Sequence, residues 1–316
     1  MMRRTTASLG FASVCALFVT ACGEPPVEVV PTGPVLDYSG SWNPASNFGG
    51  PFGHDGQPVT SEHFNVYSGT ASEEARRFTS DVAEEALGEV LDYLGLSADD
   101  FDFLPGNTDR RIDIMAIGSQ NFRNNAGFAY RDGMVVISRE APNYRQFGYD
   151  ESIYKRLMKH EGTHVVEFLL IGDPRFQQAS HVWWREGFAH YTSRPRPTMI
   201  MERGRVEAWR DSHASLPGGG NPISVRVWND FPTTIRSSGQ TFSYYDMFEL
   251  TVRYLLDPIG FGATPQDVVA LYEELGQGTS FETAIARTLE VDVATLEAEY
   301  WERIIAYLDA VAPAGG

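Results

Sequence analysis

Residues 151–169 read ESIYKRLMKHEGTHVVEFL, and this stretch carries the strongest structural and chemical signal in the chain. Its apolar residues recur at helical spacings, which predicts a helix: Ile153, Tyr154, Leu157, Met158, Val165, Phe168 and Leu169. His160 and His164 stand four residues apart, so both imidazoles project from one helix face and can reach one metal ion at about 2.0–2.1 Å. Glu161 stands beside the first histidine, where its carboxylate can take a proton from a metal-bound water. The alternative is two surface histidines that flank a glutamate on an amphipathic helix.

A site of this kind needs a third protein ligand, because a catalytic zinc ion usually keeps three and leaves one position for water. The metzincin continuation is absent, since Glu167 occupies the position of its glycine and no third histidine follows at the required spacing. The stretch WWREGFAHY at residues 183–191 offers Glu186, 22 residues after His164. That separation leaves room for a turn around residues 172–174 and for a second helix that packs back against the first. Glu186 is therefore the expected third ligand.

Two more histidines lie close to these residues in the sequence. His190 stands one turn beyond Glu186. It could bind the metal itself, or it could form hydrogen bonds to the residues that do. We expect the second role, or plain packing. His181 falls in the connection between the two helices, where we expect a solvated loop rather than a part of the site.

The residues HEGTHVV at 160–166 and WREGFA at 184–189 resemble the gluzincin zinc metallopeptidases, and most of all the peptidase MA-like domain of bacterial secreted proteins. The likeness covers roughly residues 60–310, and Trp183 holds the spacing of the family's tryptophan before the glutamate. The resemblance implies one zinc ion per chain, bound by His160, His164 and Glu186, with Glu161 as general base. It also implies an α+β fold, in which a small mixed sheet precedes a mainly helical zincin-like subdomain and the active-site cleft lies between them.

The same resemblance implies a tyrosine on a later helix that stabilises the oxyanion. Residues 242–256 are similar to that helix and place the functional tyrosine at Tyr245, with Tyr244 as the next candidate. A phenol at this position could donate a hydrogen bond to the developing negative charge. The alternative is that both tyrosines belong to the core of an amphipathic helix.

The segment 61–150 predicts the sheet. Residues 63–67 and 111–117 alternate apolar and polar side chains, as half-buried strands do, and a helix with Ser72 as its N-cap runs between them to Gly95. Residues 128–130 and 134–137 flank Asp132-Gly133, a strong hairpin signal. We expect the segment 127–130 to hold an extended peptide as an added strand.

Residues 264–308 predict helical scaffolding. Thr264 precedes a helix with proline in its first turn, and Thr279 with Glu282 has the spacing of a capping box. The last helix carries an apolar stripe, so its residues belong to the core: Leu296, Trp301, Ile304, Ile305 and Leu308. With the segment 61–150, the helical segment 151–312 makes up one domain.

The N-terminus has the features of a bacterial export signal. Arg3 and Arg4 precede a short apolar run at 9–21, which is typical of a signal peptide, and the run ends Val-Thr-Ala-Cys-Gly like a bacterial lipobox. Cys22 would then be lipidated after removal of residues 1–21; the alternative is an ordinary signal peptide cleaved near Ala21. Residues 22–60 are rich in Pro, Gly, Ser and Asn and predict a tether to the membrane. The protein is expected to be exported and lipid-anchored in the cell envelope, on the periplasmic side or the outer surface.

Composition narrows the classes of partner. The chain has 25 Lys and Arg against 42 Asp and Glu, a net charge of −17, which argues against a nucleic-acid binder. Its two cysteines, Cys15 and Cys22, both lie in or beside the predicted signal, so any metal in the folded domain must bind histidine and carboxylate.

The sequence as a whole predicts a zinc metallopeptidase that acts on a peptide or protein. A non-catalytic lipoprotein that keeps the fold as a zinc-binding or peptide-binding module, and a zinc hydrolase acting on another amide, are the alternatives.

Overall fold

The structure of the 316-residue chain is a computed structural model. It describes residues 57–68, 71–103, 107–117, 127–130, 132–141, 144, 150–172, 180–194, 202–232, 235 and 241–312. The predicted signal peptide, the lipidation site Cys22 and the predicted tether up to residue 56 lie outside the described residues. Among the described helices, none combines the length and the apolar character needed to cross a membrane.

The described part has a mixed α/β fold that is mostly helical, with one five-stranded sheet in the order β1-β2-β3-β5-β4 and eight α-helices. The strands β2, β3 and β5 are parallel, and β1 and β4 lie antiparallel at the two edges. The predicted mixed sheet and its hairpin are confirmed, and Asp132 adopts the positive φ of 61° that the tight turn requires. The bounds are β1 Val59–Thr60, β2 Phe64–Tyr67, β3 Ile112–Ile117, β4 Gly127–Tyr130 and β5 Gly133–Ile137. The strand β1 consists of the last two residues of the predicted tether, so the sheet begins before residue 61.

The central strands differ from the prediction in their burial. Every residue of β2 and β3 is buried, so the alternation of apolar and polar residues does not mark a solvent-exposed face. The polar positions are paired inside the protein instead: Asn65 on β2 donates a hydrogen bond to Asp113 on β3 at 3.1 Å. A polar residue in a buried strand is tolerated when its hydrogen bonds are satisfied.

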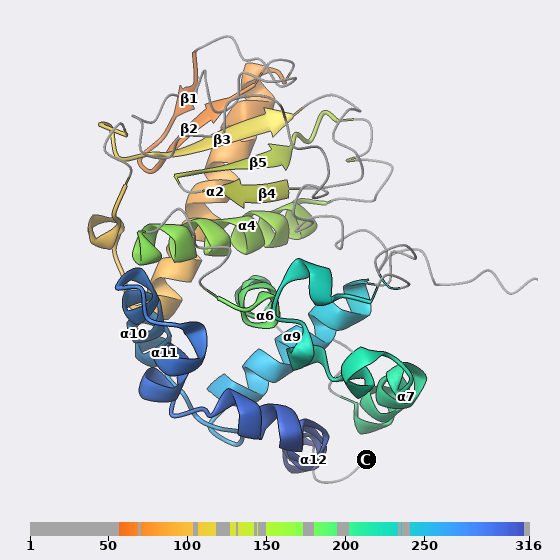
Figure 1. The fold of residues 1–316 in the computed structure, drawn as a ribbon. Helices are drawn as coiled ribbons and strands as arrows, with labels where there is room; N and C mark the ends of the chain where they lie inside the picture. Colours follow the sequence, from red (N-terminus) through yellow and green to blue (C-terminus); the bar gives the residue numbers. More distant parts are fainter. Residues whose placement is uncertain are drawn as a thin grey trace, which may run out of the picture.

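The helices form the rest of the described fold. Figure 1 shows the sheet at one end, α4 lying below β4, and α6, α9 and the C-terminal helices beyond α4. Their bounds are α2 Glu73–Leu94, α4 Glu151–Ile171, α6 Val182–Ser193, α7 Arg203–His213, α9 Thr241–Leu256, α10 Pro265–Gly276, α11 Phe281–Thr288 and α12 Val293–Val311. The helix α4 contacts the sheet through β4 and β5 and also packs against α2, α6 and α10. Together with α2, which also contacts both the sheet and α10, it joins the sheet to the C-terminal helices.

Local sequence accounts for the ends of the long helices. The Ser72 side chain caps α2, which ends at Gly95 with φ of 69°. Asp150 caps α4 by accepting from the backbone N–H of Ile153, and that helix ends at Gly172. The capping box predicted at Thr279 is wrong by one residue, because α11 is capped by Ser280, whose hydroxyl accepts from the N–H of Thr283. Serine and threonine are both good caps, so their order alone does not decide the start of a helix.

Two helices approach each other closely at Gly187 on α6. A Cβ atom at this position would lie 2.6 Å from the carbonyl oxygen of Phe248 on α9. The missing side chain thus permits a helix contact that any larger residue would open. Because Gly187 follows Glu186 directly, this contact also sets the position of the expected third ligand.

Candidate metal centre

The two motif histidines are buried side by side on α4. Their side chains are 7% exposed, and their ring centroids lie 4.9 Å apart with the rings nearly perpendicular. The alternative of two surface histidines on an amphipathic helix is therefore wrong. Burying two polar imidazole rings is costly unless polar or charged groups contact their nitrogens, so these two rings need such groups around them.

Glu186 on α6 supplies the third donor. Its Oε2 atom lies 3.6 Å from Nε2 of His160 and 3.6 Å from Nε2 of His164, and the donor atoms of the three residues form one buried group. Two ligands bound tetrahedrally at the usual zinc distances are about 3.4 Å apart. The carboxylate oxygen thus has the spacing of a co-ligand to each imidazole nitrogen, and the donor atoms of the three residues all lie within 4.8 Å of one another.

The oxygen that faces the histidines gives a second test of this fit. Oε2 of Glu186 is buried and has no hydrogen-bond partner among the described residues. A buried carboxylate oxygen without a partner is strongly disfavoured unless a cation balances it. The donor set also matches zinc chemistry, which favours imidazole nitrogen and carboxylate oxygen. The residues present fit a divalent metal ion.

The charges of the three groups are strongly coupled. Burial lowers the pKa of His160 to about 4. Burial also opposes the charge on His164, but the carboxylates of Glu186 and Glu167 outweigh it and raise its pKa to about 10. Burial acts against the Glu186 carboxylate as well, yet His164 and His160 hold the pKa of Glu186 well below its usual range. One proton therefore balances the carboxylate when no metal is bound, and a cation would take its place.

In the sequence, Glu167 is only the residue that rules out a metzincin continuation. In the structure its Oε2 atom lies 2.9 Å from Nδ1 of His164, on the side of the ring opposite the expected metal position. A carboxylate in this place orients a metal-binding imidazole. The signal available in the sequence was the spacing, because residues three apart on a helix are neighbours.

Glu161, the expected general base, is fully buried and faces the edge strand β4. A Cβ atom at Gly127 would lie 2.8 Å from both Cγ and Oε1 of Glu161, so the carboxylate occupies space that a side chain at 127 would need. Glu161 does not belong to the group formed by the two histidines and Glu186. Its place beside that group, between α4 and β4, is the one expected of a base rather than a ligand.

His190 lies behind the three donors. Its ring centroid is 4.8 Å from that of His160, but its nitrogen groups with Asp246 and Glu249 instead of with the motif histidines. Burial, followed by the charge of Arg194, holds the pKa of His190 well below its usual range. Arg194 itself bridges the two carboxylates at 2.6 and 2.7 Å. The structure thus surrounds His190 with a buried charged cluster on α6 and α9.

The two candidate tyrosines on α9 point in different directions. The ring of Tyr245 lies 5.3 Å from that of His190, whereas the ring of Tyr244 packs 5.1 Å from Trp209 on α7. Both tyrosines are buried. Of the two tyrosines on α9, Tyr245 is therefore the one that faces His190 on α6.

The expectation that His181 lies in a solvated loop is wrong. This residue is the N-cap of α6 and is 9% exposed, with its ring 4.5 Å from that of Phe281 on α11. Its Nε2 atom pairs with Glu282 at 3.1 Å. His181 is buried because α11 packs against it, a long-range contact that the local composition does not reveal.

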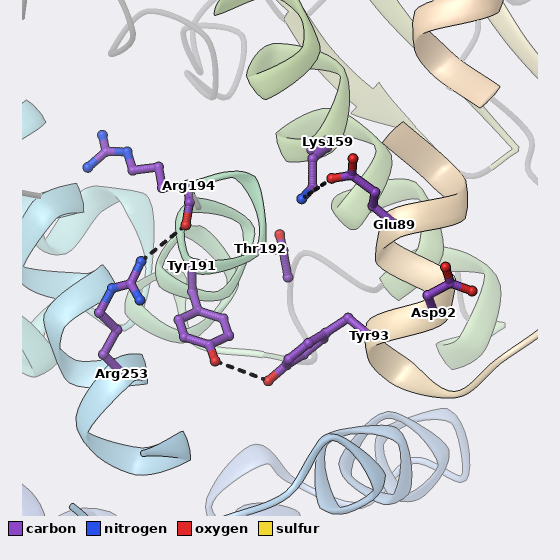
Figure 2. Close-up of a pocket in the computed structure, with 8 residues that line it drawn as sticks. All are labelled: Glu89, Asp92, Tyr93, Lys159, Tyr191, Thr192, Arg194 and Arg253. Atoms are coloured by element: carbon purple, nitrogen blue, oxygen red, sulfur yellow. Dashed lines mark hydrogen bonds and ion pairs between the residues drawn. The ribbon is translucent and has the colours of Figure 1, made fainter. Parts of the chain in front are cut away.

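A pocket of about 410 Å³ lies near this centre, where α2, α4, α6 and α9 meet. Figure 2 shows Lys159 paired with Glu89 across it, and the hydroxyls of Tyr191 and Tyr93 in contact below. Lys159 immediately precedes His160, but none of the predicted site residues lines this pocket. The pocket is therefore distinct from the predicted site.

The comparisons with known proteins add no relative. No protein-family model matches the chain, and neither the curated proteins nor the solved structures yielded a match.

Proposed function

We propose that the protein is a zinc-dependent metallopeptidase, held in the cell envelope by a lipid on Cys22, with His160, His164 and Glu186 as its metal ligands. One observation carries this proposal: a buried carboxylate oxygen without a hydrogen-bond partner among the described residues lies 3.6 Å from both motif imidazoles. The location of Glu161 beside these ligands extends the proposal from metal binding to hydrolysis. The proposed fold is zincin-like, with the cleft between the sheet and the helices.

Zinc bound to these three residues would activate a water molecule and polarise a carbonyl. Glu161 would accept a proton from the attacking water and pass it to the leaving amine. Tyr245 would donate a hydrogen bond to the oxyanion, a role supported by its contact with His190, whose ring lies against that of the ligand His160.

The peptide is proposed to bind along β4. Among the described strands, β4 pairs with β5 alone and forms the edge of the sheet, which is the position at which an extended peptide adds to a sheet. Gly127 brings that edge against the Glu161 carboxylate without a side chain between them. A scissile bond carried on this edge would thus pass beside the proposed base.

The decisive experiment compares the wild type with Glu161→Gln in a peptide-library cleavage assay and in metal analysis. We expect one zinc ion per chain in both proteins, and cleavage reduced by a factor of at least about 100 in the variant, since general-base catalysis contributes roughly 10²–10⁴-fold. Glu151→Gln is the matched control, because Glu151 lies on the same helix but is exposed in its first turn.

Three results would contradict the proposal in different ways. A zinc-loaded wild type that cleaves no peptide, and behaves like Glu161→Gln, would leave a binding module. Cleavage of amide compounds other than peptides would indicate a different hydrolase. A wild type that binds no metal, with Glu186→Gln unchanged from it, would remove the metal centre itself.

A further inference from the structure

A chain of buried hydrogen bonds connects the metal centre to the C-terminal helices. The Oε1 atom of Glu167 accepts a hydrogen bond from the hydroxyl of Tyr272 on α10 at 2.5 Å, and its Oε2 atom faces Nδ1 of His164 at 2.9 Å. Trp184 on α6 donates its indole N–H to the same hydroxyl at 3.3 Å. All four residues are buried, with Glu167 and Tyr272 fully so.

The donors and acceptors in this chain have one consistent order. An indole N–H can only donate, so the oxygen of Tyr272 accepts from Trp184 and its hydrogen goes to Glu167. With Oε1 occupied in this way, the remaining oxygen of the carboxylate accepts from Nδ1–H of His164. When His164 is neutral, as binding a metal requires, that arrangement selects the tautomer with a lone pair on Nε2, the atom that lies 3.6 Å from Oε2 of Glu186.

Packing alone does not account for a glutamate at this position. Glu167 is flanked by Val166 and Phe168 on a buried part of α4, and a nearby core of aromatic rings surrounds Tyr272 and Trp184. An apolar residue of similar volume would avoid the cost of removing a carboxylate from water. The carboxylate is retained, and both of its oxygens point to groups that bear on the metal ligands.

We propose that Glu167 and Tyr272 are positioning residues that set the metal affinity of His164, so that helix α10 forms part of the metal centre. Glu167 holds the imidazole directly, and Tyr272 acts through Glu167. The same hydroxyl accepts a hydrogen bond from the indole N–H of Trp184, which lies two residues before Glu186 on α6. The chain therefore links the two helices that carry the ligands. This inference rests on the metal site of the proposed function but not on peptide hydrolysis.

The test measures metal binding in the full chain. Dissociation constants for Zn²⁺ are determined by competition with a chelator for the wild type, Glu167→Gln, Tyr272→Phe and the double variant, and absorption spectra are recorded with Co²⁺. We expect Glu167→Gln to weaken zinc binding by about 10–100-fold, and Tyr272→Phe to weaken it several-fold. Both variants should also shift the Co²⁺ ligand-field bands. Because Tyr272 acts through Glu167, its substitution should add little in the Glu167→Gln background.

Tyr300→Phe is the matched control. Tyr300 is also fully enclosed and shares a hydrogen bond with Thr251 at 2.9 Å, but on α12, away from the ligands. We expect its metal affinity and Co²⁺ spectrum to equal those of the wild type. Tyr272→Phe keeps the ring and removes only the hydroxyl, so it decides the question even where Glu167→Gln folds poorly.

Two outcomes overturn the inference and are distinguishable. If the wild type binds zinc and Tyr272→Phe has the same dissociation constant and spectrum, the hydrogen bonds through Tyr272 do not set the metal affinity. The proposed function would then still stand. A wild type that binds no zinc removes both together.

Discussion

At the scale of single residues, the charged groups next to each buried histidine determine its pKa. His160 and His164 have identical side chains four residues apart on one helix, but their pKa values move in opposite directions, to about 4 and about 10. Burial lowers the pKa of both rings, but Glu186, followed by Glu167, raises the pKa of His164, and the charge on His164 in turn lowers the pKa of His160. The two carboxylates together thus favour the proton on His164 when no metal is bound.

Gly127 gives the first residue-scale prediction. We expect Gly127→Ala to lower kcat by about tenfold or more, because the new Cβ would lie 2.8 Å from Glu161 and must displace its carboxylate. Steady-state kinetics on the peptide found in the library assay would measure this loss.

The control for this change is Gly88→Ala. Gly88 lies within α2, and a Cβ atom there would meet no atom within 4 Å. Alanine should raise the free energy of unfolding by about 0.5–1 kcal/mol through helix propensity and leave kcat unchanged. Equal kcat values for Gly127→Ala and the wild type would show that the Glu161 carboxylate does not need its observed position.

At the scale of elements, the helix α4 is well specified by its own sequence. Asp150 caps its first turn, Gly172 ends it in the left-handed conformation, and the apolar spacing between them is helical. The helix α6 depends more on its surroundings, since its N-cap His181 makes no capping bond and its start is stabilised by contacts with α11. The two ligand-bearing helices therefore differ in how far local sequence determines them.

The cap of α4 leads to a prediction with a defined pH dependence. The backbone N–H of Ile153 and the hydroxyl of Ser152 hold the pKa of Asp150 below its usual value. Its contribution is therefore present above about pH 4, the ordinary pKa of an aspartate, and is lost as the pH falls through the lower folded-state value. We expect Asp150→Ala to lower the free energy of unfolding by about 1 kcal/mol at pH 7, and the deficit to shrink below pH 4.

Urea denaturation at pH 7, 5 and 3.5 would measure this dependence. Asp150→Asn is the control, because asparagine caps a helix equally well without a charge, and its stability should follow a flatter pH profile. A deficit for Asp150→Ala that stays constant down to pH 3.5 would rule out the ionised carboxylate as its source.

At the scale of the whole molecule, a bound metal would tie α4 to α6. Anything that binds only the folded state stabilises it, by about 4 kcal/mol at a ligand concentration 1,000 times the dissociation constant. For a domain of this size that is roughly 8–16 °C in Tm. We expect zinc to raise Tm by this amount and a chelator to reverse it, as measured by thermal unfolding.

The ligand variant Glu186→Gln separates a specific site from general surface binding. The amide removes the charge that balances the metal but keeps the shape of the side chain, so zinc should leave the Tm of this variant nearly unchanged. An equal rise of Tm in Glu186→Gln and in the wild type would place the bound zinc elsewhere, for example on the acidic surface of a chain with a net charge of −17.

Much of the fold follows from the sequence, and the exceptions have physical causes. The alternation in residues 111–117 correctly predicts a strand, but it does not show that Asp113 is buried, because Asn65 on a neighbouring strand satisfies it. The composition around His181 is that of a loop, but α11 covers it from 100 residues further along the chain. Local sequence patterns predict the secondary structure of a segment. The burial of its side chains depends on which distant element packs against them.

By itself, the sequence determined a helix with two histidines on one face, a neighbouring glutamate in the place of a base, and a second stretch with a candidate third ligand. These follow from helical periodicity and capping, which act over a few residues. Only the tertiary structure decided that Glu186 meets both imidazoles, that Tyr245 rather than Tyr244 faces His190, and that Tyr272 reaches Glu167. Glu167 and Tyr272 are 105 residues apart in the sequence, and the close packing of helices α4, α6 and α10 alone brings them within hydrogen-bonding distance.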